Sequence, residues 1–159
     1  MGNSSTSSIY LTAANNGNLD KMLDLLQSGT AAVNSTNANG LGAIHLAAKK
    51  DHNDIVSELL NRGADVNMAT NNGNTALHIA SLAGHLDMVT LLVQHGALVN
   101  SQSKKGFTPL YMAAQENHVA IVKYLLDQKA NPALATVDGF TPLAVALQQG
   151  HAEVVKLLK

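Results

Sequence analysis

Seven histidines are the residues of this chain that could bind a metal ion or transfer protons. Four of them are 33 residues apart: His52, His85, His118 and His151. If that spacing is the period of a stacked unit, they lie too far apart to share an ion at ligand distances of about 2 Å. His45 and His78 each lie seven residues before one of these, across a helix break, unlike the i, i+4 pair of a zinc-binding helix. We therefore expect structural hydrogen bonds from the histidines and no metal site.

Other residue patterns give no indication of catalysis. The chain has no cysteine, which excludes disulfides, thiolate metal ligands and a Cys-His nucleophile. It has no Gly-x-Ser-x-Gly elbow, and its evenly spaced glycines do not form a phosphate-binding loop. Acidic residues are scattered singly, as on the solvated faces of helices. We therefore expect a protein that is not an enzyme and has no cofactor.

Charge and hydropathy narrow the class of partner. A formal net charge of -1 gives no long-range field to attract nucleic acid or an anionic membrane. No apolar run approaches the ~20 residues of a membrane span, so we expect no direct membrane insertion. The polar opening, Met1 to Ser8, lacks the apolar region of a signal peptide, and the absence of cysteine favours an intracellular protein. These features predict a cytoplasmic location.

The spacing of the histidines belongs to a 33-residue period that runs along the chain. It relates glycines, threonines, alanines, histidines, valines and leucines in six registers. Two of these registers are Gly40, Gly73, Gly106 and Gly139, and Leu59, Leu92, Leu125 and Leu158. A weaker copy, with Ala13-Ala14 and Gly17-Asn18, precedes them. This period is typical of a helix-turn-helix unit with a connecting β-turn, stacked on its neighbours.

Local signals within one copy agree with that unit. Asn72 to Thr75 has the composition of a turn, and Thr75 is a helix cap. A short helix over 76–82 is expected to end at Gly84, and a second helix over about 87–95 to end at Gly96. Neither helix is long enough to be stable alone, so each copy must bury its faces against its neighbours.

The fold class that follows is all-α, a solenoid of about five helix-turn-helix units with projecting β-hairpin loops. We expect ten helices, in repeats of about 8–34, 35–67, 68–100, 101–133 and 134–159, the last incomplete. Residues 1–7 are expected to be a disordered tail or residues left by expression engineering, which we prefer to a myristoylation site at Gly2. The last copy keeps Val154, Val155, Leu157 and Leu158 in the ordinary internal pattern, so we expect an open interface there in a fragment of a longer array.

These residues resemble the ankyrin repeat, whose core reads Gly-x-Thr-Pro-Leu-His-x-Ala-Ala-x-x-Gly-His. The stretches Gly73 to His85 and Gly106 to His118 match it closely, and the resemblance extends over residues 8–159. Asp51 and Asn117 replace the glycine that ends the first helix. Tyr111 and Ala144 replace the histidine that usually braces the turn, and Gly42-Ala43-Ile44 replaces Thr-Pro-Leu, which should weaken that helix start.

Longer stretches are similar to the opening repeats of animal ankyrins, the adaptors that join membrane proteins to the spectrin skeleton. They include Gly73 to Ala80, Phe107 to His118 and Asp138 to His151. The resemblance implies a scaffold, peripheral at the membrane, whose concave groove binds extended cytoplasmic segments of ion channels, transporters or adhesion receptors. It also implies that the protein's own C-terminal segment can occupy the groove in autoinhibition. A designed or reconstructed repeat protein, or a recognition module of an unrelated pathway, is the alternative.

In such a stack the groove is lined by the hairpin tips and the ends of the first helices. The helix positions are Asn15, Asn16, Lys49, Lys50, Leu82, Ala83, Gln115, Glu116, Gln148 and Gln149. The hairpin positions are Asn37, Leu41, Thr70, Asn71, Asn74, Ser103, Lys104, Phe107, Thr136, Val137 and Phe140. Amides can pair with a peptide backbone, and the two phenylalanines can contact apolar side chains. Alternatively, the Asn, Ser and Thr residues satisfy their own turns, and the phenylalanines stack on the next hairpin.

Overall fold

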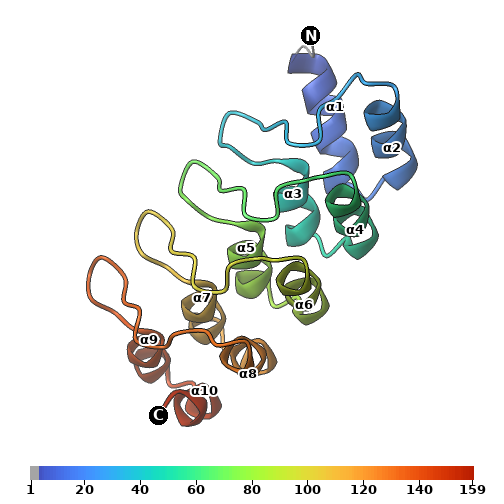
Figure 1. Ribbon diagram of the computed structural model, residues 1–159. Coiled ribbons are helices and arrows are strands. Elements are labelled where there is room, and N and C mark those ends of the chain that lie inside the picture. The colour runs from blue at the N-terminus through green and yellow to red at the C-terminus, as the bar shows by residue number, and fades with distance from the viewer. Residues whose placement is uncertain (1–3) are drawn as a thin grey trace.

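The computed structural model describes residues 4–159. Within these residues it contains ten helices in five consecutive antiparallel pairs and no regular strand (Figure 1). The pairs are α1 (Ser4–Asn15) and α2 (Leu19–Gln27), α3 (Ala43–Lys49) and α4 (Asn53–Asn61), α5 (Ala76–Ala83) and α6 (Leu86–Gln94), α7 (Pro109–Gln115) and α8 (Val119–Asp127), and α9 (Pro142–Gln149) and α10 (Ala152–Leu158). The predicted all-α repeat solenoid is confirmed. No helix within residues 4–159 has the length and apolar composition needed to cross a bilayer.

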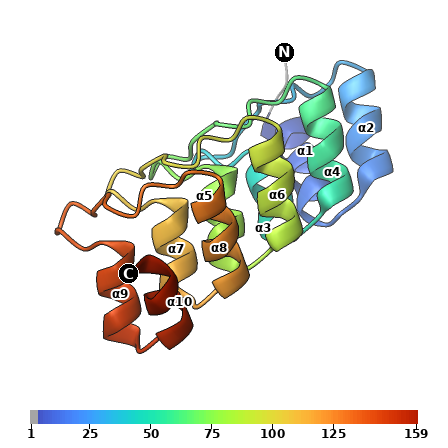
Figure 2. The ribbon, with the colours of Figure 1, turned by 60° about the horizontal axis from the view of Figure 1, so that its bottom comes forward.

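The helices form two rows, and the connecting loops extend to one side of them. The first helices of the pairs, α1, α3, α5, α7 and α9, form the row next to the loops, and the second helices form the row behind it (Figures 1 and 2). Each first helix packs on its own partner, and consecutive first helices pack on one another from α1 to α9. The second helices contact one another less extensively. The stack is therefore elongated, with loops, first helices and second helices as successive layers.

The first helix begins earlier than the sequence indicates. Helix α1 begins at Ser4, so residues 4–7 are helical although we expected them to belong to a tail. The buried residues Tyr10, Ala13 and Ala14 fix the rest of this helix. Adding a turn to a helix that is already anchored needs no new nucleation, so polar residues at its exposed end can extend it. Residues 1–3, with the candidate myristoylation site, lie outside the described part.

Threonine caps begin three of the first helices. Thr75, Thr108 and Thr141 have extended backbones, and each hydroxyl accepts the N–H of the residue three positions on, at 3.4, 3.0 and 3.2 Å. Gly42 has no such hydroxyl, but its own N–H donates to His45 Nδ1 at 2.9 Å. An equivalent bond joins the Thr75 N–H to His78. Helix α3 thus keeps one of the two hydrogen bonds that brace the start of α5.

The first helices end in left-handed backbone, whichever residue stands there. Gly84 and Gly150 have φ of 86° and 74°, and Asp51 and Asn117 reach 62° and 61° at the equivalent positions. This conformation costs a non-glycine residue roughly 1–2 kcal/mol, less for Asn and Asp than for other types. The turn to the second helix is therefore the same in all of these repeats.

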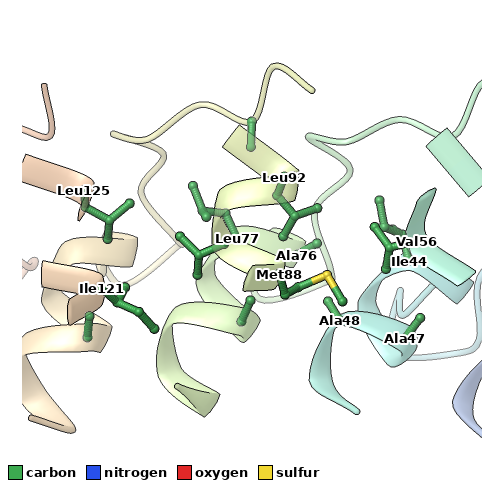
Figure 3. Close-up of a cluster of buried hydrophobic side chains, with 14 of the residues drawn as sticks. Ile44, Ala47, Ala48, Val56, Ala76, Leu77, Met88, Leu92, Ile121 and Leu125 are labelled. Atoms are coloured by element: carbon green, nitrogen blue, oxygen red, sulfur yellow. The ribbon is translucent and has the colours of Figure 1, made fainter. Parts of the chain in front are cut away.

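The core runs continuously along the stack, as expected for residues that each copy must bury against its neighbours. Small side chains of the first helices, such as Ala47, Ala48 and Ala76, lie beside larger ones such as Leu77, Met88 and Leu92 (Figure 3). These six side chains are fully buried. Alanine on a first helix lets the neighbouring helix approach closely, and each large side chain that is fully buried contributes about 1.5–3 kcal/mol. The core is built from aliphatic residues, as the composition indicates.

The four loops 35–42, 68–75, 101–108 and 134–141 are hairpin-shaped but carry no strand ladder. One isolated bridge, Thr36 to Gly42, is present among the described residues. Neighbouring loops are joined at their tips by backbone hydrogen bonds from Asn71 N to Asn39 O, Lys104 N to Asn72 O and Val137 N to Lys105 O, at 3.1, 3.0 and 2.9 Å. The tips therefore form a continuous wall beside the first helices.

Candidate binding groove

Each of the four histidines in the 33-residue register joins two repeats. Its Nε2–H donates to a backbone carbonyl near the end of the preceding first helix. The pairs are His52 to Asn15 O, His85 to Lys49 O, His118 to Leu82 O and His151 to Gln115 O, at 3.1, 3.0, 2.9 and 3.0 Å. Because a carbonyl can only accept, the Nε2 atom must carry the proton. Each ring therefore joins the start of a second helix to the end of the first helix in the preceding repeat.

His45 and His78 brace the turns from inside. The His78 ring accepts the Thr75 N–H at Nδ1 and donates its Nε2–H to Phe107 O at 2.8 Å. His45 makes the same bonds, to the Gly42 N–H and to Met68 O at 2.8 Å. Both rings are buried, and desolvation lowers their pKa below the ordinary 6.5 although each carbonyl partner favours the charged form. A neutral ring is required, because a protonated Nδ1 cannot accept the backbone N–H.

The prediction that the histidines make structural hydrogen bonds is confirmed. The seventh, His95, follows α6 directly, and its Nδ1–H donates to Leu91 O of that helix at 2.9 Å. Tyr111 and Ala144, which replace the bracing histidine in two repeats, make no equivalent side-chain bond in the part of the chain that the structure describes. Nor do three His, Asp or Glu side chains converge there in a group that could hold a metal ion.

Two adjoining hollows lie between the loops and the first helices. The first hollow has a volume of about 660 Å³ and is bordered by loops 35–42 and 68–75, by α3 and α5, and by the end of α1. The second hollow has a volume of about 410 Å³ and is bordered by loops 68–75 and 101–108 and by Met112 of α7. Asn72 and Asn74 border both. We refer to the two hollows together as the groove.

The groove contains part of the residue set predicted from the sequence. Leu41, Lys49, Thr70, Asn74 and Leu82 border the first hollow, and Asn74, Ser103, Lys104 and Phe107 border the second, with Asn15 and Ala83 also at the first. The predicted residues that border neither hollow are Asn16, Asn37, Lys50, Asn71, Gln115, Glu116, Thr136, Val137, Phe140, Gln148 and Gln149. The structure therefore concentrates the candidate site on the second, third and fourth repeats.

Several predicted contact residues are used by their own turns. Asn37, Thr70, Ser103 and Thr136 share one register, and each side-chain oxygen accepts the backbone N–H four residues on, at 3.0 to 3.2 Å. The Asn71 amide donates to Ala38 O of the preceding loop at 2.8 Å. For the first four residues the turn interpretation accounts for the side chain, whereas Asn71 joins two neighbouring loops.

The two phenylalanines differ in environment. Phe107 is partly buried, and its ring packs on Tyr111 with a centroid distance of 5.1 Å and a tilt of 47°. Its ring therefore stacks within its own repeat, and it also borders the second hollow. Phe140 is 48% exposed and borders neither hollow.

Sequence reasoning missed seven residues of the groove. They are Asn39, His45, Leu46, Asn72, Ile79, Lys105 and Met112. Leu46, Ile79 and Met112 are 33 residues apart and apolar, but the buried register of Ile55, Met88 and Ile121 has the same pattern, so the pattern does not separate the groove from the core. A signal could have found three others. Asn39, Asn72 and Lys105 each precede the repeated glycine, at the hairpin tip.

Comparison with known proteins supports the repeat assignment. A sequence profile described as ankyrin repeats in three copies matches residues 10–103 and 96–159. A stretch of 41 residues is 56% identical to human Ankyrin-1. This stretch covers 26% of this chain and 2% of Ankyrin-1. The profile spans nearly the whole chain, whereas the similarity to Ankyrin-1 is local.

Proposed function

The chain belongs to the ankyrin-repeat family, a protein-interaction module, and we propose from that premise that it is a non-catalytic scaffold whose groove binds extended segments of partner proteins. The observation that carries this proposal is the groove itself. It extends over two consecutive loop pairs and has both apolar side chains and amides on its surface. In six histidines of the repeat registers the Nε2–H group donates to a backbone carbonyl, which supports a structural role for them.

A more specific role is that of an ankyrin-type adaptor. We propose that the partners are cytoplasmic tails of ion channels, transporters or adhesion receptors, and that the parent protein links them to the spectrin skeleton at the cytoplasmic side of the membrane. A C-terminal segment of the same protein would then compete for the groove. The local similarity to human Ankyrin-1 supports this proposal. The alternative, a recognition module with an unrelated or engineered ligand, shares the groove and differs in the partner.

A peptide array of such cytoplasmic tails, probed with the purified chain, tests both the general scaffold role and the specific adaptor role. Bound tails should be lost or weakened by Lys49→Glu with Lys50→Glu, and by Phe107→Ala with Phe140→Ala. We expect about 1–3 kcal/mol for a central aromatic contact and about 1 kcal/mol or less for exposed charges. Lys123→Glu with Lys156→Glu, two exposed changes on the second helices, is the matched control.

The outcomes separate the alternatives. Tails that bind the chain and its control but not the groove variants support the adaptor. Binding that survives both groove variants contradicts a concave site. If no tail binds, while peptides from another source bind and respond to the same variants, the scaffold role stands and the adaptor role fails.

A further inference from the structure

The charges that border the groove have one sign. Lys49, at the end of α3, borders the first hollow, and Lys104 and Lys105 border the second. No Asp or Glu is among the residues that line either hollow. Within residues 4–159, the ion pairs are Arg62 with Glu58 and His85 with Asp51, so these three lysines have no carboxylate partner. Although the chain as a whole has a net charge of -1, this surface is locally positive.

Between these lysines the surface of the first hollow is largely apolar. Leu41 comes from loop 35–42, Leu46 from α3, and Ile79 and Leu82 from α5. Leu82 is 40% exposed, although most leucines of the stack are buried or half-buried. A volume of about 660 Å³ is large enough for a bulky aliphatic or aromatic side chain and the backbone on either side of it.

The spacing of the lysines sets the length of a matching ligand. Helix α3 packs on α5, and α5 packs on α7, which follows the loop that carries Lys104 and Lys105. Neighbouring packed helices are about 8–10 Å apart, so two such steps span about 16–20 Å. Lys49 is the last residue of α3, whereas the loop with Lys104 and Lys105 precedes the first residue of α7, so an offset of about 10 Å along the helices raises the span to about 19–22 Å. An extended peptide advances about 3.3 Å per residue and covers that span in about six or seven residues.

We propose that the groove recognises an extended segment in which a bulky apolar residue is flanked by two acidic residues about six or seven positions apart. The apolar side chain enters the first hollow against Leu82 and Ile79. One carboxylate pairs with Lys49 and the other with Lys104 or Lys105. This inference rests on the proposed function, because it describes the ligand of the same groove.

Selection from a display library of random twelve-residue peptides, with the whole 159-residue chain as bait, tests it. Enriched peptides should share the acidic, apolar, acidic pattern at that spacing. A labelled peptide from the enriched pool should bind about three- to tenfold more weakly to Lys49→Glu and to Leu82→Ser, and more weakly at higher salt. Lys123→Glu on the exposed face of α8 should leave its affinity unchanged. Circular dichroism of each variant controls for folding, and both groove changes are at exposed positions.

Each outcome decides between this inference and the broader function. Enriched peptides that are basic or neutral, or that bind Lys49→Glu and Leu82→Ser as tightly as the original chain, overturn the acidic and apolar pattern. If such peptides still lose affinity in Phe107→Ala, the groove binds peptides and only this inference fails. If no peptide is enriched and no tail binds on the array, the proposed function fails with it.

Discussion

The stacking of the hairpin loops leaves no room for a side chain at Gly106. A Cβ atom there would lie 2.9 Å from both Thr136 Cα and Val137 N of the next loop. Gly139, one repeat later, has nearly the same backbone, with φ of 88° against 84°, but nothing lies within 4 Å of its Cβ position. Gly106→Ala and Gly139→Ala therefore share the strain of left-handed backbone, and only the first also meets a neighbouring loop.

The difference between the two variants measures the contact between loops. The shared strain costs roughly 1–2 kcal/mol. In Gly106→Ala the obstacle is backbone, which must move, so overpacking adds about 1–3 kcal/mol. The hydrogen bond from Val137 N to Lys105 O is also lost or lengthened, at about 0.5–1.5 kcal/mol. We expect Gly106→Ala to destabilise the chain by about 1.5–4.5 kcal/mol more than Gly139→Ala.

Urea unfolding followed by circular dichroism gives the two free energies, provided that the slope with denaturant is the same for both variants. Repeat arrays can lose cooperativity, so amide hydrogen exchange at Val137 provides an independent measurement. That amide should exchange faster in Gly106→Ala and be unchanged in Gly139→Ala. Equal losses of stability in the two variants, with equal exchange at Val137, would refute the stacking of the loops.

Three further predictions concern polar side chains of the stack. Because burial lowers the pKa of His45 and His78 below 6.5, the unfolded chain binds protons that the folded chain does not, so stability should fall as pH drops below about 6.5. Urea midpoints that stay constant from pH 7 to 5 would contradict this. Ser81 Oγ is fully buried without a hydrogen-bond partner within residues 4–159, so Ser81→Ala should raise stability by about 1 kcal/mol, and a lower thermal midpoint would contradict it. The Asn67 side chain accepts the Leu98 N–H and donates to Gly96 O, and both of these partners belong to the next repeat. Asn67→Ala should therefore lower the free energy of unfolding by about 1–3 kcal/mol, and an unchanged urea midpoint would argue against a role in joining repeats.

The helices could be predicted because local chemistry and the repeat period agree. Thr108 and Pro109, for example, fix the start of α7, and Gly84 fixes the end of α5. The beginning of α1 could not be predicted, because Ser4 to Ser7 have no apolar pattern and continue a helix that is anchored further along. The hydrogen bond of Tyr10 could not be predicted from the local sequence either. Its hydroxyl donates to Val33 O at 2.8 Å, a long-range bond that no local pattern indicates, and burial raises the pKa of this phenol.

The groove was harder to predict, since a position in a repeat does not reveal how its side chain is used. Ser103 and Lys104 are neighbours in one loop, yet the hydroxyl closes the turn while the lysine remains exposed beside the second hollow. Asn39 and Lys105 were missed because tip residues differ from repeat to repeat. The apolar register of Leu46 was missed because its period coincides with that of the core.

Amide chemical-shift mapping of the isotope-labelled chain, titrated with a peptide that it binds, shows which residues form the binding surface. We expect the largest changes along the groove, at Leu41, Lys49, Ile79, Leu82 and Lys104, with little change in α4, α6 and α8. Changes concentrated on those second helices, with the groove residues unaffected, would contradict binding in the groove.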